Sequence, residues 1–547
     1  MRRSRWIAGV AAPLTVALVL AGCGSSNDSG GGGGGNSGGN SADQQAKNDA
    51  AEITLRGSEP QNALIPGNTT EEGGAKIVDE LWTGLVTNDP VSNEPKNANA
   101  EKIDFSSDAT SATITLKKGW KFHDGTDVKA KNYVDSWNYT AFGPNAQLGA
   151  SFFEQIKGFK ETNAKDSTVK AMSGLEVVDD YTFKVTFNEP HAIFPVKLGY
   201  HVFAPMPDVF FKDPKAFEAK PIGNGRYKFV SRVPKQSVSV EKFADYQGTD
   251  KGHIGKVKFV FPESLDAAYA QVKSNQLDFL EQMPPSAIAG NLWKADLKDH
   301  SGVGDVLSIQ IINFPLYFQQ YANADLRKAI SMAINRDEVN QKIFEGYRKP
   351  VDGFAVPKVP GWEDGGCGDL CKYNPDKAKE ALAKSGFKGK IEITSNADGG
   401  HKEWIEAVCG NIKNTLGIEC NFAPVQTFGE IRKKITAKEM TQIYRGGWIA
   451  DFPYIENFLN PLYRTGGSSN QGGYSSPAVD AKLAEADRAK SLDEASKLYR
   501  EAEKMIAQDM PAIPLWATPR LYGWSNKIKN VRMTPRGQLD LGFVDIA

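Results

Sequence analysis

One segment indicates how this chain folds: Ile114-Thr115-Leu116-Lys117-Lys118-Gly119-Trp120-Lys121-Phe122-His123-Asp124-Gly125-Thr126. It continues an alternation of apolar and polar residues over 112–118, which is the pattern of a strand with one buried face. The chain then turns within the quoted segment and enters a stretch that carries Tyr133, Val134 and Trp137, which we expect to be helical. The segment therefore predicts a strand, a turn and a helix in succession.

Strand and helix patterns continue outward from this segment in both directions. Expected strands lie at residues 51–56, 112–118, 181–187, 227–230, 238–243, 256–261, 305–318, 390–394 and 420–424. Expected helices lie at 265–274, 326–334, 402–416 and 491–508, and others begin near 375 and 477. Because the chain returns through 513–516 toward its start, we interpret the α/β part as a second lobe inserted into the first. Connections near 305–310 and 510–516 would then form a hinge.

Length and charge limit the possible functions. A chain of 547 residues exceeds the size at which a single hydrophobic core keeps growing, so two or three lobes and a large cleft are expected. Its 65 basic and 66 acidic side chains nearly balance, which leaves no strong field for a polyanion. Nucleic acid is therefore not an expected partner.

The N-terminus resembles a bacterial lipoprotein signal. Arg2, Arg3 and Arg5 precede an apolar run from Trp6 to Leu20, which is too short to cross a bilayer and leads into Leu20-Ala21-Gly22-Cys23. The resemblance implies cleavage of residues 1–22 and acylation of Cys23, so that the protein is lipid-anchored at the outer face of the cytoplasmic membrane, in the cell envelope. An ordinary secretory signal is the alternative, and the sequence does not decide between Sec and twin-arginine export.

The residues after this signal predict a tether. From Gly24 to about Asn48 the chain consists of Gly, Ser, Asn, Asp, Gln and Lys with almost no side chain to bury. We expect residues 23–50 to be a disordered leash that holds the folded part away from the membrane.

Four further cysteines suggest a structural role in an oxidising compartment. Their even number favours disulfides, and we predict the two local pairs, Cys367–Cys371 and Cys409–Cys420. A four-cysteine zinc site is the rival interpretation, although the spacings are not those of C-x₂-C motifs.

The stretch from Arg445 to Phe458 carries the chemistry of a binding site. Arg445 is followed by Gly446-Gly447, the aromatic Trp448 and the carboxylate of Asp451. Such a segment would hold a zwitterion, with Asp451 on an ammonium and Arg445 on a carboxylate, while the glycines let the backbone approach the ligand. The alternative is an internal Arg–Asp ion pair beside a core tryptophan.

No catalytic motif accompanies this segment. The six histidines are scattered, and neither a metal-binding H-x-x-x-H pair nor a G-x-S-x-G nucleophile motif occurs. The glycine pairs lack the context of a phosphate-binding loop. We therefore expect no enzyme activity, no cofactor and no metal.

Four motifs in order resemble the bacterial extracellular solute-binding proteins of family 5, the peptide and nickel receptors of ABC importers. They are the quoted segment, the glycine-rich turn at 221–227, the helix at 326–334 and the Gly-Trp-x-Ala-Asp segment that ends at Asp451. The resemblance spans about residues 51–547. Lys117 stands where the family usually has Arg, and residues 131–133 replace an acidic pattern at the start of a helix, which bears on packing more than on the ligand.

The resemblance implies a fold. We expect an α/β, two-lobed periplasmic-binding-protein-like architecture (type II, cluster C) with an extra inserted subdomain and a hinge of two crossing segments. The expected parts are lobe I at 51–82, 205–305 and 515–547, the extra subdomain at 83–204, and lobe II at 306–514.

The resemblance also implies a ligand and the residues that hold it. By family likeness Asp451 binds the α-ammonium of a peptide and Arg445 the carboxylate of a short one, with Trp448 and Gly447 beside it and Tyr444 and Asn68 as weaker candidates. The partners would be short peptides and the permease and ATPase subunits of an importer, with the protein itself a monomer. A nickel chelate, an oligosaccharide or an opine is an alternative cargo, and a peptide-sensing lipoprotein is an alternative role.

Overall fold

The computed structural model describes residues 39–91 and 94–547. The predicted signal at 1–22, Cys23 and the tether up to residue 38 lie outside the described residues. The end of the predicted tether differs from the prediction, because Gly39–Ala50 form helix α1. Asn48 Nδ2 donates to Asp545 Oδ1 at 2.6 Å, so a contact with the far end of the chain orders residues whose composition alone suggests disorder. Among the described residues, no helix is both long and apolar enough to cross a bilayer.

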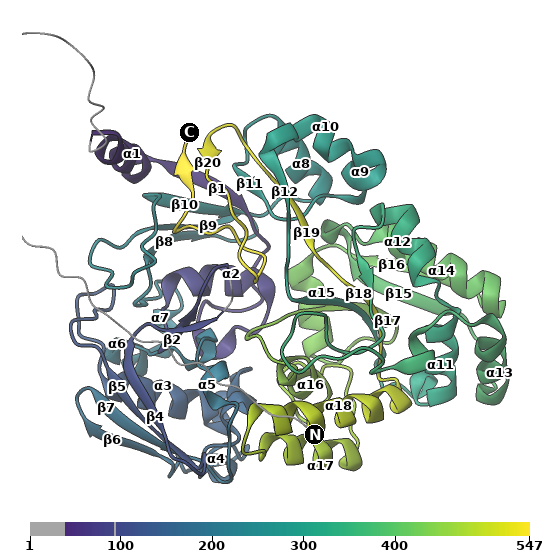
Figure 1. Ribbon diagram of the computed structural model, residues 1–547, viewed down its shortest axis with the longest axis horizontal. Coiled ribbons are helices and arrows are strands. Elements are labelled where there is room, and N and C mark those ends of the chain that lie inside the picture. Colours follow the sequence, from purple (N-terminus) through teal and green to yellow (C-terminus); the bar gives the residue numbers. More distant parts are fainter. Residues whose placement is uncertain (1–38, 92–93) are drawn as a thin grey trace, which may run out of the picture. The chain divides into compact units, whose positions relative to one another are not determined.

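The first sheet has seven strands in the order β12-β19-β11-β1-β10-β9-β8 (Figure 1). Strand β1 pairs in parallel with β10 and β11, and the other pairs are antiparallel. Its strands are β1 (Glu52–Arg56), β8 (Tyr227–Val233), β9 (Ser237–Lys242), β10 (Lys256–Val260), β11 (Phe279–Leu280), β12 (Ser301–Gly304) and β19 (Arg520–Trp524). Nearby elements are α2 (Glu72–Leu81), β2 (Val86–Asn88), β3 (Pro95–Asn97), α6 (Asp208–Lys212), α7 (Pro214–Phe217), α8 (Leu265–Lys273), α9 (Pro285–Ile288), α10 (Leu292–Leu297), β20 (Ile528–Lys529) and β21 (Asp545–Ile546).

A separate four-stranded antiparallel sheet, in the order β4-β5-β7-β6, contains the segment quoted first. The predicted strand is β5 (Ser111–Leu116), with alternate residues buried, and the predicted helix is α3 (Ala130–Ala141). Tyr133 and Trp137 are fully buried against Phe183 of β7, with ring centroids 5.7 and 5.5 Å away. The remaining elements are β4 (Ala100–Phe105), β6 (Leu175–Asp179), β7 (Thr182–Thr186), α4 (Phe159–Thr162) and α5 (Phe194–Lys197).

The second large sheet has six strands in the order β14-β18-β13-β17-β15-β16. It mixes parallel pairs, among β15, β16 and β17, with antiparallel pairs around β13 and β18. The strands are β13 (Ser308–Asn313), β14 (Lys349–Pro350), β15 (Ile391–Asn396), β16 (Cys420–Val425), β17 (Ile443–Ile449) and β18 (Ala512–Ala517). The helices are α11 (Ala324–Ala333), α12 (Arg336–Phe344), α13 (Pro375–Ser385), α14 (Lys402–Leu416), α15 (Phe428–Thr436), α16 (Glu456–Tyr463), α17 (Pro477–Asp487) and α18 (Leu492–Asp509).

The chain passes between the two large sheets twice. Strand β12 leads out of the first sheet into β13 of the second, and β18 leads back into β19. Ser308 and Thr518 join the two passages, because the Thr518 N–H donates to the Ser308 carbonyl at 3.0 Å. The crossings therefore lie at residues 305–307 and 518–519, and the second is a few residues later than the predicted 510–516.

Both disulfides have the predicted partners. Cys367 pairs with Cys371, and Cys409 of α14 pairs with Cys420 at the start of β16. These cysteines are therefore disulfide-bonded and form no zinc site. The described residues contain no cluster of three or more His, Cys, Asp or Glu side chains arranged to hold a metal ion.

Candidate functional site

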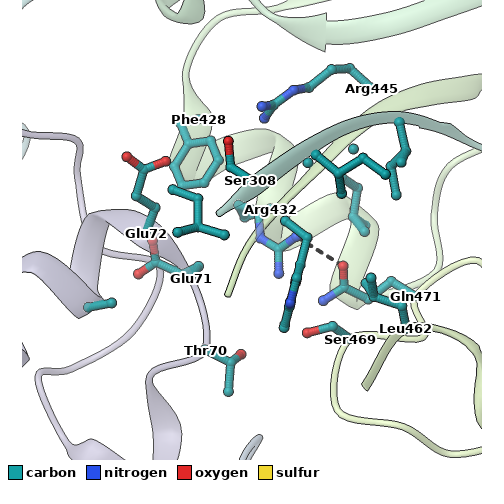
Figure 2. Close-up of a pocket in the computed structure, with 18 of the residues that line it drawn as sticks. Thr70, Glu71, Glu72, Ser308, Phe428, Arg432, Arg445, Leu462, Ser469 and Gln471 are labelled. Atoms are coloured by element: carbon teal, nitrogen blue, oxygen red, sulfur yellow. Dashed lines mark hydrogen bonds between the residues drawn. The ribbon is translucent and has the colours of Figure 1, made fainter. Parts of the chain in front are cut away.

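A cavity of about 130 Å³ lies between residues that belong to the two large sheets and their helices. Figure 2 shows Thr70, Glu71 and Glu72 on one side, facing Arg432 and Gln471 on the other. Residues of β13, α15, β17 and β19 and of the turn after β17 complete the wall: Ser308, Ile311, Asn313, Phe428, Ile431, Tyr444, Arg445, Gly447, Trp448, Asp451 and Arg520, among others. The walls combine apolar surface with several charged groups, as is typical of a site for a polar small molecule.

Five of the six residues predicted to bind the ligand line this cavity: Tyr444, Arg445, Gly447, Trp448 and Asp451. The sixth, Asn68, does not. Its side-chain oxygen accepts a hydrogen bond from the Leu148 N–H at 3.2 Å, so it fixes a neighbouring loop instead.

The two glycines of β17 make room for other side chains of the site. A Cβ atom on Gly447 would lie 2.6 Å from Nη2 of Arg445, and one on Gly446 would collide with the Asn313 amide. The Arg445 guanidinium can lie over the strand only because Gly447 has no side chain. From the sequence, the two glycines are expected to let a ligand backbone approach closely. In the structure they also leave space for the Arg445 guanidinium.

Asp451 is held in place by one neighbouring amide side chain. The Asn457 Oδ1 atom accepts from the Asp451 N–H at 2.8 Å and from Trp448 Nε1 at 2.9 Å, and Asn457 Nδ2 donates to Asp451 Oδ2 at 3.1 Å. Trp448 is thus a buried part of the wall, 8% exposed, as well as a residue that lines the cavity. One fully buried asparagine orients both residues.

Burial makes the Asp451 carboxylate costly to ionise. It raises the pKa of Asp451 to about 6, although the positive charge of Arg536 and the hydrogen bond from Asn457 favour the ionised form. Arg536 itself forms an ion pair with Asp79 at 3.2 Å, so its charge is already shared. A cation placed beside Asp451 would restore its ordinary ionisation.

Arg445 has the opposite charge and no partner for it. In the part of the chain that the structure describes, the only hydrogen bond of its side chain is a long one, 3.4 Å, from Nη2 to Gln310 Oε1, and its Nε atom is buried without a partner. Burial lowers the pKa of Arg445 to about 10, against the opposing effect of Glu72. An uncompensated guanidinium at a cavity wall is a site for an anion.

Other cavity-lining polar atoms also lack partners. The Thr70 Oγ1, Tyr444 hydroxyl and Ser469 Oγ atoms are buried and form no hydrogen bond with a described residue. Because buried polar groups are nearly always hydrogen-bonded, these atoms indicate that the cavity receives a molecule with several polar groups.

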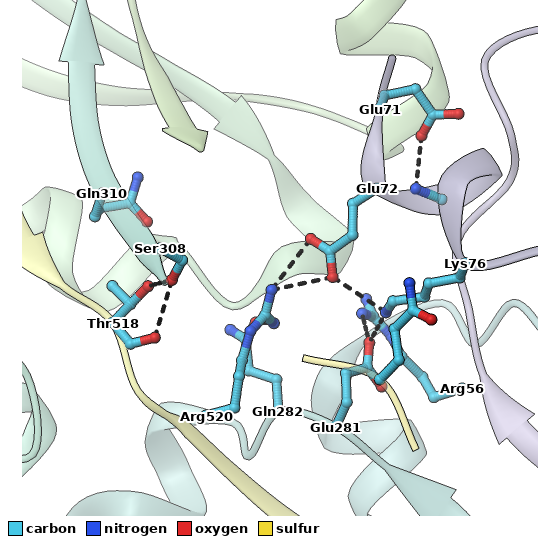
Figure 3. A network of polar contacts seen from close by, with 12 residues as sticks. Arg56, Glu71, Glu72, Lys76, Glu281, Gln282, Ser308, Gln310, Thr518 and Arg520 are labelled. Atoms are coloured by element: carbon cyan, nitrogen blue, oxygen red, sulfur yellow. Dashed lines mark hydrogen bonds and ion pairs between the residues drawn. The ribbon is translucent and has the colours of Figure 1, made fainter. Parts of the chain in front are cut away.

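A network of ion pairs at the edge of the cavity compensates the charges of Glu72 and Arg520 (Figure 3). Arg520 Nη2 lies 3.0 Å from Glu72 Oε1, and Lys76 Nζ lies 3.1 Å from the same atom and 2.6 Å from Glu281. Arg56 pairs with the same oxygen of Glu281 at 2.7 Å. These neighbouring positive charges hold the pKa of Glu72 far below its usual range. Arg520 and Glu72 therefore neutralise each other, whereas the positive charge of Arg445 has no ion-pair partner among the described residues.

The sequence analysis missed several residues of this site. Asn457 lies within the stretch from Arg445 to Phe458. Its position six residues after Asp451 was therefore a signal in the sequence that could have been used. Thr70, Tyr200, Arg520 and Arg536 come from distant segments, and no local pattern marks them.

Comparisons with known proteins identify the family of this chain. The model of the bacterial extracellular solute-binding proteins, family 5, middle region, matches residues 94–470. The dipeptide-binding protein DppE of Bacillus subtilis is 25% identical over 472 residues, covering 83% of this chain and 84% of that protein. The oligopeptide-binding protein OppA of the same organism is 23% identical over 494 residues, covering 87% and 89%.

Solved structures show the same fold. The murein tripeptide binding protein MppA of Escherichia coli superposes with a TM-score of 0.82 at 21% identity, covering 90% of this chain and 98% of that one. The unliganded open form of MppA gives 0.61 over 90% and 97%. The chain belongs to the bacterial extracellular solute-binding proteins of family 5, which are substrate-binding proteins of ABC importers and not enzymes.

Proposed function

We propose that this protein is a lipid-anchored, extracytoplasmic receptor that captures short peptides and delivers them to the permease of an ABC importer. The N-terminal sequence up to Cys23 supports the anchor, and the names of the dipeptide- and oligopeptide-binding relatives support the class of ligand. Asp451 would bind the peptide ammonium and Arg445 its carboxylate, with Trp448, Tyr444 and Gly447 beside the peptide backbone.

One observation carries this proposal. The cavity holds the Arg445 guanidinium, which has no ion pair, and the Asp451 carboxylate, whose pKa is raised by burial, both on the same short segment. A zwitterion satisfies both at once, because its ammonium compensates Asp451 and its carboxylate compensates Arg445. Backbone amides of a peptide would also pair with the free hydroxyl groups of Thr70, Tyr444 and Ser469.

Binding would be coupled to closure of the lobes about the two crossings at 305–307 and 518–519. Residues from both large sheets line the cavity, so closure of the lobes would enclose a ligand between them. Two passages joined at Ser308 and Thr518 would allow such a hinge motion. The lower TM-score against the open form of MppA is consistent with a closed arrangement in this chain.

Calorimetry with three forms of one tripeptide tests the proposal. We expect free Ala-Ala-Ala to bind, while the N-acetylated and the C-amidated forms bind at least about 10-fold more weakly, because each leaves one buried charge without a partner. Arg445→Gln should weaken the free peptide and abolish the difference between it and the amide. If the blocked peptides bound as tightly as the free one, a zwitterion would not be the ligand.

Peptide affinity should also fall in acid. In the empty receptor Asp451 has a pKa of about 6, and the ligand ammonium binds only its ionised form. Below pH 6 binding must therefore release a proton, which weakens affinity by up to about 10-fold for each pH unit, whereas affinity changes little between pH 6.5 and 7.5. Dissociation constants measured from pH 4.5 to 7.5 check this. The slope should vanish in Asp451→Asn, and an unchanged slope there would assign it to another group, such as Glu71.

A further inference from the structure

A smaller chamber of about 50 Å³ adjoins the main cavity and shares Arg445 with it. Its other polar lining residues include Gln282, Gln310, Arg348, His401 and Arg520. Three guanidinium groups thus line this chamber, and its lining contains no carboxylate. Only Arg520 is neutralised, through its pair with Glu72 (Figure 3).

Arg348 is the unexplained charge of this chamber. Its guanidinium carbon lies over the Phe344 ring, 3.5 Å from the centroid, and its buried Nη1 atom has no hydrogen-bond partner. Its side chain forms no ion pair within the described residues, and burial together with the positive charges of Arg445 and Arg520 holds its pKa well below the usual range. Stacking on an aromatic ring fixes the plane of a guanidinium and leaves its edge free to bind a carboxylate.

His401 supplies a neutral donor to the same chamber. Its Nδ1 atom accepts a hydrogen bond from Trp404 Nε1 at 3.2 Å, so its proton resides on Nε2. Burial and the nearby arginines hold its pKa well below the ordinary value, which keeps the ring uncharged. An N–H donor beside two unpaired guanidiniums adds to a site for an anion.

Charge counting points to two ligand carboxylates. The ammonium of a peptide would compensate Asp451 and its terminal carboxylate would compensate Arg445, which leaves Arg348 unpaired. A longer peptide that placed its terminal carboxylate at Arg348 would leave Arg445 unpaired instead. Because Arg445 borders both cavities, the last residue of a short peptide would have its side chain at the mouth of the chamber.

Resting on the peptide-binding function proposed above, we propose that the chamber at Arg348 receives the side-chain carboxylate of an acidic C-terminal residue. The preferred ligands are thus acidic short peptides with one ammonium and two carboxylates, and a net charge of −1. Arg348 is the residue that determines this preference.

The test compares the isosteric peptides Ala-Ala-Glu and Ala-Ala-Gln by calorimetry at pH 7. Wild-type protein should bind the Glu peptide about 10-fold or more tightly, because only it pairs with Arg348. Arg348→Gln should remove this preference while leaving the affinity for Ala-Ala-Gln within about 3-fold. Arg348→Lys should retain part of the preference, which shows that the charge matters apart from the stacking. Arg488→Gln, at an exposed arginine, is the matched control and should retain all of it.

Three results would overturn the inference. Equal binding of both peptides by the wild type is one, and a preference that survives in Arg348→Gln is another. The third is an equal loss of affinity for both peptides in Arg348→Gln, which would mean that Arg348 binds the terminal carboxylate or is needed for folding. In all three cases the peptides still bind to the wild type, so the proposed function stands. Failure of both peptides and of Ala-Ala-Ala to bind folded wild-type protein would instead refute the proposed function.

Discussion

Replacing Asp451 by Asn should weaken binding of a free tripeptide by about 2–5 kcal/mol, which is on the order of 30- to 5,000-fold in dissociation constant. The substitution keeps the size of the side chain and leaves its amide next to Asn457. It removes the negative charge, so a ligand ammonium in the closed cavity would be buried without a counter-ion. Most of the loss is the cost of that unpaired charge.

The N-acetylated peptide separates this effect from a general change in the site. Because it has no ammonium, it should lose no affinity in Asp451→Asn, where the carboxylate that it leaves unpaired in the wild type is absent, so the loss should be confined to the free peptide. Asp166→Asn, at an exposed loop position, is the matched control and should bind as the wild type does. Equal binding of acetylated and free peptides by wild-type protein would show that Asp451 does not bind the ammonium.

The core of the site could be predicted because its charged residues are close in sequence. Arg445, Trp448 and Asp451 lie on one strand and the turn that follows it, so a single short segment reveals an opposite pair of charges with an aromatic residue between them. Their shared location in a cavity wall follows from that local geometry. The role of each residue toward a ligand remains a prediction.

The opposite wall of the cavity could not be predicted in the same way. Glu72 and Arg520 are separated by 448 residues, and their pairing depends on how β19 returns beside the start of α2. Nothing near either residue in the sequence distinguishes a network member from an exposed charge. Asn68 lies two residues from Thr70 of the cavity wall but is not part of the wall, and its own side chain accepts a hydrogen bond from the Leu148 N–H.

The fold, like the site, could be predicted from the sequence only in part. The strands and helices with strong periodicity, such as β5, α3, α14 and α18, lie close to where the sequence predicts them. Helix α1 was not predicted, because contacts of Gln44 and Asn48 with the C-terminal residues order a segment of polar composition. Long-range contacts of this kind leave no periodic signal.

A second buried ion network joins the four-stranded sheet region to helices α16 and α17. Arg464 pairs with both Glu154 and Asp487, and Lys197 Nζ lies 2.9 Å from Glu456 Oε1 with both side chains nearly inaccessible. His191, beside Asp487, is neutral because burial lowers its pKa to about 3. None of these residues lines the cavity, so we expect the network to act on stability.

Replacing Arg464 by Met should lower the free energy of unfolding by about 3–5 kcal/mol, because it leaves the buried carboxylate of Asp487 and the half-buried carboxylate of Glu154 without their cation. Urea unfolding at pH 7 measures the loss, and Arg488→Met, at an exposed position one residue after α17, should change it by less than about 0.5 kcal/mol.

The pH dependence of this loss distinguishes the missing charge from altered packing. In the wild type, Arg464 lowers the pKa of Asp487, so this carboxylate stabilises the fold above its unfolded pKa and the benefit disappears as pH falls. Without Arg464, burial would raise the pKa of Asp487 above its unfolded value, so ionisation would destabilise the variant and protonation would relieve it. The difference between the two proteins should therefore shrink as pH falls from 7 toward about 4. A loss that stayed constant over this range would mean that Arg464 acts through the packing of its side chain and not through its charge.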